Sequence, residues 1–174
     1  EEAPAFTEAL LPHVCALCGE DVARRALSFA QARAIGQTDH ATYKAMVALV
    51  HNLNTMHSRA GAQIPFSSIN YGMDTSPEGR MVVKNLLLAT EAGMGQGETP
   101  IFPIQIFRVK EGVNYNPGDP NYDLFRLAIR CSAKRLFPNF SFLDAPFNAR
   151  YYKGTPETEI AYMGCRTRVI GNVY

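Results

Sequence analysis

The sequence predicts an α/β fold with largely parallel strands, because helical and strand-like segments alternate between residues 40 and 165. The chain has 174 residues, of which 47% are hydrophobic and 19% are charged, as in globular proteins with a well-buried core. No internal repeat or low-complexity segment interrupts the alternation. The length corresponds to one ordinary domain or to a piece of a larger one.

The composition argues against two classes of partner. The formal net charge is only +1, so nucleic acid is not the default partner. No apolar run has the length of a membrane span, and the acidic start, Glu1-Glu2, is unlike a secretory signal. We therefore expect a cytoplasmic protein that binds neither nucleic acid nor a membrane. Its four cysteines are then expected to be reduced thiols.

The first third of the chain is expected to be helical. Residues 5–18 and 21–34 are rich in Ala and Leu and predict two short helices with a break near Cys18-Gly19. Residues 40–56 predict a further helix, because apolar side chains recur along one stripe. The small residues that follow predict a loop, and residues 63–71 predict a strand.

A capping signature begins the next helix. Thr75 and Glu78 have the spacing of a capping box, and Pro77 stands in the first turn. Gly93 and Gly95 are expected to stop this helix. The glycine-rich run 93–97 follows a helix and does not open one, so it is not expected to bind a phosphate.

Strands and one helix are expected in the second half of the chain. The apolar run 101–109 is typical of a strand buried on both faces. A helix is expected from Pro120, with Cys131 on its apolar stripe and therefore in the core. Shorter strands are expected at residues 139–143 and 158–163.

The pair Cys15 and Cys18 leaves two interpretations open. A CxxC motif can form half of a zinc site or a redox pair. However, no second CxxC is present, and this one lies in a helical run rather than after a strand. Two small packing residues near a helix end are the favoured reading. No metal site is predicted, because the four histidines also lack the spacing of metal ligands: His13, His40, His51 and His57.

Cys165 has a different setting from the other cysteines. A strand-like run precedes it, Gly164 permits a tight turn, and Arg166 and Arg168 follow it. Spacing alone leaves a functional cysteine and a buried turn cysteine equally open. Nucleophilic catalysis would need a histidine partner, and none is near in the sequence.

Two stretches of the chain resemble the anaerobic, class III ribonucleoside-triphosphate reductases. They are "HNLNTMHSRAGAQIPFSSINYG" at residues 51–72 and "YMGCRTRVIGNVY" at residues 162–174. The intervening sequence, including "SPEGRMVVKNLLLATEAG" from residue 76, is similar as well. The resemblance covers residues 40–174 without a gap. Residues 1–38 match loosely and are expected to be a helical segment that the resemblance leaves unassigned, with a partial catalytic barrel at residues 39–174.

The resemblance implies both a fold and a catalytic residue. The family fold is a ten-stranded α/β barrel made of two five-stranded parallel halves, and a finger loop with a cysteine at its tip enters the barrel. Cys165 matches that cysteine and would become a transient thiyl radical that abstracts the 3′-hydrogen of the ribose. S–H and activated C–H bonds are close in strength, so this transfer would be reversible.

The loop after residue 57 resembles the family's second specificity loop. In that interpretation it lies between a deoxynucleotide effector at the dimer interface and the substrate base. An ordinary loop between a helix and a strand is the alternative that the sequence pattern favours when taken alone. The loop residues are Ser58, Arg59, Ala60, Gly61, Ala62 and Gln63.

Two positions bear on the class of reductase. Aerobic reductases carry a carboxylate two residues after the finger cysteine, where this chain has Thr167. The resemblance therefore implies the anaerobic class, in which formate supplies the reducing equivalents. Gly171 stands in a context similar to the family's glycyl radical site, but Asn172 replaces the expected tyrosine. We interpret Gly171 as a coincidental match.

The resemblance also predicts what belongs to the full-length enzyme. The glycyl radical and a structural zinc site are expected in a C-terminal region outside this chain, which holds no cofactor of its own. Expected partners are ribonucleoside triphosphates, dNTP and ATP effectors, formate, a radical SAM activase and a second subunit in a homodimer. We therefore expect an internal fragment that is inactive alone. The alternative is a non-catalytic nucleotide-binding module derived from the barrel.

Overall fold

The computed structural model describes residues 2–165 and 167–171, and the chain divides into two compact units, Glu1–Ala41 and Thr42–Tyr174. The first unit contains α1 (Glu2–Cys18) and the beginning of α2 (Glu20–Thr55). Gly19 separates the two helices with a φ of 82°, as the sequence predicted. None of the helices, within the described ranges, is long and apolar enough to cross a membrane.

The prediction of two separate helices at residues 21–34 and 40–56 is wrong, because the single helix α2 runs through both ranges. The intervening residues 35–39 include Gly36, which weakens a helix by only about 1 kcal/mol relative to Ala. The hydroxyl of Thr38 donates to the carbonyl of Ala34 at 2.9 Å, so this polar side chain is satisfied within the helix. Neither residue is therefore sufficient to end a helix of this length.

The second unit is built on a parallel sheet of order β1-β2-β3, which confirms the predicted α/β class. The strands are β1 (Ser68–Tyr71), β2 (Ile104–Val109) and β3 (Asn139–Phe142). The first two are shorter than the ranges 63–71 and 101–109 that the sequence predicted. Pro65 and Pro103 lie in the parts left out, and proline has no N–H to donate to a ladder.

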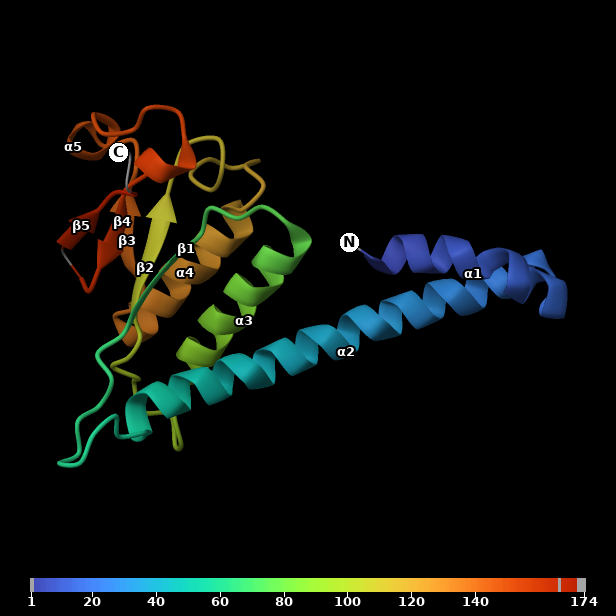
Figure 1. Ribbon diagram of the computed structural model, residues 1–174, viewed down its shortest axis with the longest axis horizontal. Helices are drawn as coiled ribbons and strands as arrows, with labels where there is room; N and C mark the ends of the chain where they lie inside the picture. The colour runs from blue at the N-terminus through green and yellow to red at the C-terminus, as the bar shows by residue number, and fades with distance from the viewer. Residues whose placement is uncertain (1, 166, 172–174) are drawn as a thin grey trace. The chain divides into compact units, whose positions relative to one another are not determined.

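Two helices lie side by side on one face of this sheet (Figure 1): α3 (Pro77–Ala92) and α4 (Tyr122–Arg135). The expected Thr75 cap is wrong, because Ser76 is the N-cap of α3 and its Oγ accepts from the amide of Gly79 at 3.1 Å. Serine is at least as good a cap as threonine, and Pro77 then fills the first helical position as expected. Gly93 ends the helix, also as expected.

The core lies between these helices and the sheet. Phe107 of β2 is fully buried and packs among the aromatic rings of Tyr71, Phe125 and Phe140. Cys131 is also fully buried there, as its place on the apolar stripe predicted. The buried members of this core are Val83, Leu87, Phe107, Val109, Leu124, Ala128 and Cys131.

The other face of the sheet is more polar. Side chains alternate between the two faces of a strand, and parallel partners in register share a face. The register pairs Ser68 with Ile104, Asn70 with Ile106, and Arg108 with Ser141. Because Phe107 faces the helices, these residues face away from them. This face, defined by Ser68, Asn70, Ile106, Arg108 and Ser141, is called the polar face below.

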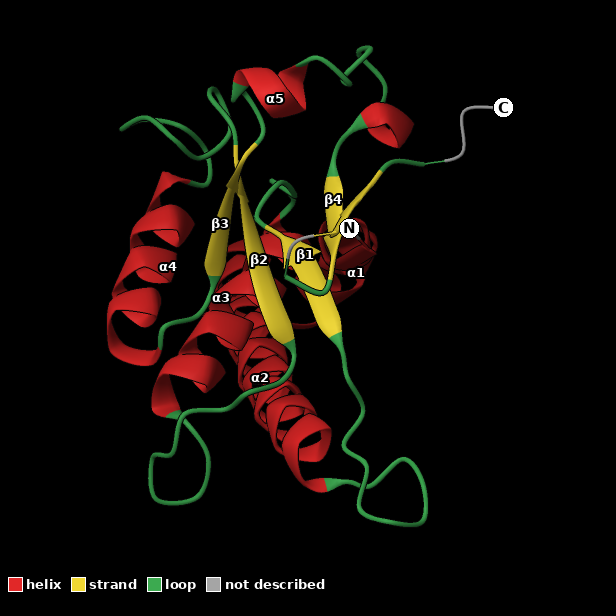
Figure 2. Ribbon diagram, turned by 90° about the vertical axis from the view of Figure 1, so that its left-hand side faces the viewer, coloured by secondary structure: helices red, strands yellow, loops and turns green. Residues whose placement is uncertain are grey.

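The C-terminal part of the chain reaches this polar face. After α5 (Pro146–Ala149) and the single turn η1 (Pro156–Thr158), the strands β4 (Ala161–Met163) and β5 (Thr167–Val169) form an antiparallel hairpin. Figure 2 shows the hairpin beside β1. The strand expected at residues 158–163 is therefore shorter than predicted, because its first residue belongs to η1.

Candidate functional site

The hairpin presents Cys165 at its turn. The register pairs Ala161 with Val169 and Met163 with Thr167, so Gly164 and Cys165 directly follow the last paired residue of β4. Gly164 has a φ of 62°, a left-handed conformation that glycine adopts without steric cost. Cys165 follows it, and its side chain is exposed within this chain.

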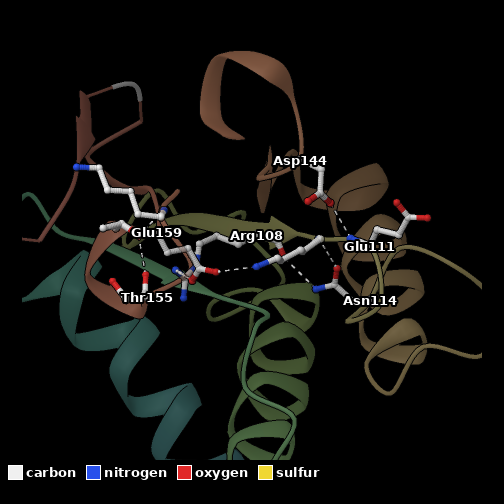
Figure 3. A network of polar contacts seen from close by, with 9 residues as sticks. Arg108, Glu111, Asn114, Asp144, Thr155 and Glu159 are labelled. Atoms are coloured by element: carbon white, nitrogen blue, oxygen red, sulfur yellow. Dashed lines mark hydrogen bonds and ion pairs between the residues drawn. The ribbon is translucent and has the colours of Figure 1, made fainter. Parts of the chain in front are cut away.

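A charged network attaches the segment before the hairpin to β2. Nη1 of Arg108 donates to Oε2 of Glu159 at 2.8 Å, and Nζ of Lys110 lies 3.6 Å from Oε1 of the same carboxylate. Figure 3 shows Arg108 and Glu159 facing each other. All three side chains are less than a quarter exposed, so solvent screens these ion pairs less than it would on an open surface.

Two polar side chains of β1 contact the hairpin directly. The side-chain amide of Asn70 donates to the carbonyl of Tyr162 at 2.7 Å and accepts from the amide of Tyr162 at 2.9 Å. The hydroxyl oxygen of Ser68 accepts from the amide of Gly164 at 3.0 Å. The segment leading to Cys165 is therefore bonded to the polar face at Tyr162 of β4 and at Gly164 of the turn.

The strand after Cys165 is held by the neighbouring segments. Nη1 of Arg168 donates to the carbonyl of Phe147 at 2.8 Å, and its guanidinium lies 5.7 Å from the ring centre of Tyr151. The amide of Gly171 donates to the carbonyl of Glu157 at 2.8 Å. These bonds hold the base of the hairpin and leave its turn exposed.

The predicted specificity loop lies on the surface and is closed on itself. All six residues from Ser58 to Gln63 are exposed. Ser58 donates to the carbonyl of Gln63 through its amide at 2.7 Å and through its hydroxyl at 3.0 Å. Gly61 and Ala62 both have a positive φ, of 98° and 63°. The loop leads into Phe66 and then Ser68, which connects it along the chain to the residues that contact the hairpin.

The other three thiols have different environments. Burial raises the pKa of the Cys131 thiol to about 11, which keeps it neutral at physiological pH. Cys15 is partly buried and Cys18 is exposed at the end of α1, where its Sγ lies 3.2 Å from the carbonyl of Val14. Among the described residues, no group of three or more His, Cys, Asp or Glu side chains could hold a metal ion.

Sequence reasoning singled out Cys165 and the loop but missed the residues that hold the hairpin. Ser68 and Asn70 alternate with the less polar Ile69 and Tyr71, which is the pattern of a strand with one polar face. This alternation could have identified the polar face in advance. The ion pairs of Glu159 could not be found in that way, because Arg108 and Lys110 lie about 50 residues away in the chain.

The fold and the site together define an α/β protein in which a hairpin presents one cysteine at the polar face of a parallel sheet. The sequence model of the family described as "Anaerobic ribonucleoside-triphosphate reductase" matches residues 8–172. The chain belongs to this family, which confirms the resemblance. The match includes residues 8–38, which the resemblance had left unassigned.

Curated relatives of the same name agree with this assignment. The anaerobic ribonucleoside-triphosphate reductase of Escherichia coli (strain K12) is 34% identical over 139 residues, which are 79% of this chain and 18% of that protein. The protein of the same name from Enterobacteria phage T4 is 36% identical over 143 residues, 82% of this chain and 22% of that protein. The chain therefore spans about a fifth of the length of these relatives.

Proposed function

We propose that the chain is part of the catalytic barrel of an anaerobic ribonucleoside-triphosphate reductase, in which Cys165 carries the thiyl radical. The observation that supports this proposal most directly is the exposed Cys165 at the turn of a hairpin bonded to the polar face. In a barrel, that face of β1–β3 would look inward, with α3 and α4 outside. Family membership supplies the reaction, in which ribonucleoside triphosphates become 2′-deoxyribonucleoside triphosphates.

The proposed first step is a hydrogen-atom transfer at Cys165. The sulfur radical takes the hydrogen atom from C3′ of the ribose, so one C–H bond breaks, one S–H bond forms and the unpaired electron moves to carbon. Formate is the proposed reductant: its hydrogen and two electrons replace the 2′-hydroxyl, formate is oxidised to CO2, and the hydroxyl takes up a proton and leaves as water. The reverse transfer from the Cys165 thiol then restores the hydrogen at C3′ and the radical at sulfur.

The residues of this chain would contribute position and shielding to that step. Reacting atoms in such transfers must be held close and in line, and this alignment supplies much of the rate enhancement. Thr167 occupies the place where a carboxylate would stand in an aerobic reductase, which favours an external reductant. The exposed loop 58–63 is the proposed specificity loop, which would respond to a dNTP or ATP effector at a dimer interface.

The radical itself would come from outside this chain. A glycyl radical made by a radical SAM activase is proposed to generate the thiyl, and a structural zinc site would belong to the same C-terminal region. Gly171 is not proposed for that role. A Cβ at position 171 would lie 2.8 Å from the backbone oxygen of Glu157, so close packing gives a structural reason for glycine there.

Replacing Cys165 by serine in the full-length protein tests the proposal. Cys165→Ser should abolish anaerobic, formate-dependent reduction while nucleotide binding stays near the wild-type level, because an O–H bond is too strong to take part. Cys18→Ser is the matched control, since Cys18 is another exposed thiol and belongs to the first unit. Substantial turnover by the Cys165→Ser protein would refute the thiyl assignment. Nucleotide binding without turnover in the wild type would favour the non-catalytic module.

A further inference from the structure

The hairpin that carries Cys165 is attached to the sheet by side chains. Among the described strands, β4 pairs with β5 alone, and the parallel sheet ends at β1. No backbone ladder therefore fixes the register of β4 against β1 within these residues. The contacts that fix it are those of Asn70 and Ser68.

Asn70 replaces the missing ladder at one residue. A side-chain amide carries one acceptor oxygen and donor N–H groups, which is what a peptide group of a neighbouring strand would offer. Asn70 uses both, because it bonds the carbonyl of Tyr162 at 2.7 Å and the amide of Tyr162 at 2.9 Å. A hydrophobic side chain of similar size could make neither bond, and the backbone groups of Tyr162 would lose both partners.

Ser68 fixes a second point, at the start of the turn that follows β4. Its hydroxyl accepts from the amide of Gly164 at 3.0 Å, one residue before Cys165. The two contacts lie two residues apart on β1 and two residues apart on the hairpin. Two fixed points set the direction of the segment as well as its position, so both the place and the approach of the Cys165 turn depend on them.

We propose that Asn70 and Ser68 are positioning residues that hold the Cys165 sulfur at the distance from the substrate which hydrogen-atom transfer requires. This role rests on the proposed function of Cys165. A misplacement of about 1 Å can lower a rate about 10²-fold when the transfer needs close contact. Loss of either contact is therefore expected to lower kcat and to leave KM nearly unchanged, because both side chains use their polar atoms to bond the hairpin.

The test compares three kinds of variant in the full-length protein. Ser68→Ala and Asn70→Leu remove the contacts, whereas Ser68→Thr keeps a hydroxyl and has a side chain that suits a strand. Asn54→Leu is the matched control. Asn54 makes the same type of contact with a different segment, since its amide donates to the carbonyl of Phe102 and accepts from the amides of Ile101 and Phe102.

Two measurements separate positioning from stability. Turnover gives kcat and KM, and amide hydrogen exchange reports protection of Tyr162 and Gly164 whether or not the protein is active. We expect kcat to fall about 10- to 100-fold in Ser68→Ala and Asn70→Leu, with faster exchange at the hairpin. Ser68→Thr should recover most of the rate. Asn54→Leu should lose protection at residues 101–102 without a comparable loss of kcat.

The outcomes distinguish a failure of this inference from a failure of the proposed function. If hairpin exchange rises but kcat stays at the wild-type value, while Cys165→Ala is inactive, the contacts are structural and the positioning role is overturned. If exchange at Tyr162 and Gly164 does not change, the contacts themselves are refuted. If Cys165→Ala retains full turnover, the proposed function fails, and the positioning role fails with it.

Discussion

Two glycines of the hairpin region occupy their positions for different physical reasons. Gly164 has a left-handed backbone with φ of 62°, but a Cβ there would meet the Phe66 ring only at 3.8 Å, an ordinary contact. Gly171 shows the opposite case, because its Cβ would lie 2.8 Å from the backbone oxygen of Glu157. Glycine is favoured at position 164 by the backbone conformation, and at position 171 because no room is left for a side chain.

This difference predicts the order of two alanine substitutions. Gly164→Ala should cost about 1 kcal/mol, the usual penalty for a left-handed non-glycine residue. Gly171→Ala should cost more, about 1–3 kcal/mol, because the backbone must move to relieve the clash. Amide hydrogen exchange of residues 157–171 in the full-length protein measures both local costs. A larger effect from Gly164→Ala would contradict this interpretation.

The buried thiol of Cys131 gives a pH-dependent prediction. Its pKa is raised from 9.0 to about 11 by burial, so the native thiol stays neutral where an unfolded one ionises. The contribution of this thiol to the free energy of unfolding is therefore fully present below pH 9 and lost as pH rises toward 11.

Alkylation mapped by mass spectrometry at pH 8 should modify Cys18 and Cys165 long before Cys131. Denaturant should remove the difference, and rapid native labelling of Cys131 would contradict its burial.

At the scale of elements, local patterns predicted the types of most segments but not their ends. The apolar stripe of α4 placed Cys131 correctly in the core, and Gly93 ended α3 as expected. The start of α3 was missed by one residue because Asp74, Thr75 and Ser76 can each cap a helix. Only the backbone geometry distinguishes them, and this geometry depends on how the chain arrives from β1.

The candidate site was predictable only in part. The residue sequence around Cys165 indicated a turn, and the structure has a turn at Gly164 with Cys165 exposed beside it. The contacts of Asn70 and Glu159 with the hairpin join residues far apart in the chain. They arise from the order of the strands, and no local periodicity encodes that order. The role of loop 58–63 stays a prediction.

The proposed role of loop 58–63 in effector response gives a further prediction. Gly61 has a φ of 98°, which a β-branched side chain tolerates poorly, so Gly61→Val should force a different loop backbone. Effector-dependent substrate preference should then weaken, within the 5- to 150-fold range typical of coupling between sites. Competition assays with each effector in the full-length protein measure this preference. Gly112→Val is the control, because Gly112 also has a positive φ but lies in another loop. An unchanged pattern in Gly61→Val would make the loop a simple connector.

At the scale of the whole molecule, the described residues leave much apolar surface uncovered. Phe66 is 74% exposed, Leu136 is 81% exposed and Leu17 is 86% exposed. The outer strands β1 and β3 are also open to further pairing within the parallel sheet. Exposed apolar side chains and open strand edges together are typical of surfaces that contact other parts of a protein. This pattern agrees with a chain that spans about a fifth of its relatives.

The last prediction concerns residues 1–174 produced alone. This piece should associate, because the apolar side chains and strand edges would be exposed to water. Light scattering over a range of concentrations measures its mass. The double variant Leu17→Lys, Phe29→Lys should associate less, since both side chains are mostly exposed apolar groups. A monomer at every concentration would instead indicate a self-contained module.

The piece should also lack reductase activity with formate and the activase. Activity would overturn the interpretation of Gly171, because the piece would then need a glycyl radical of its own.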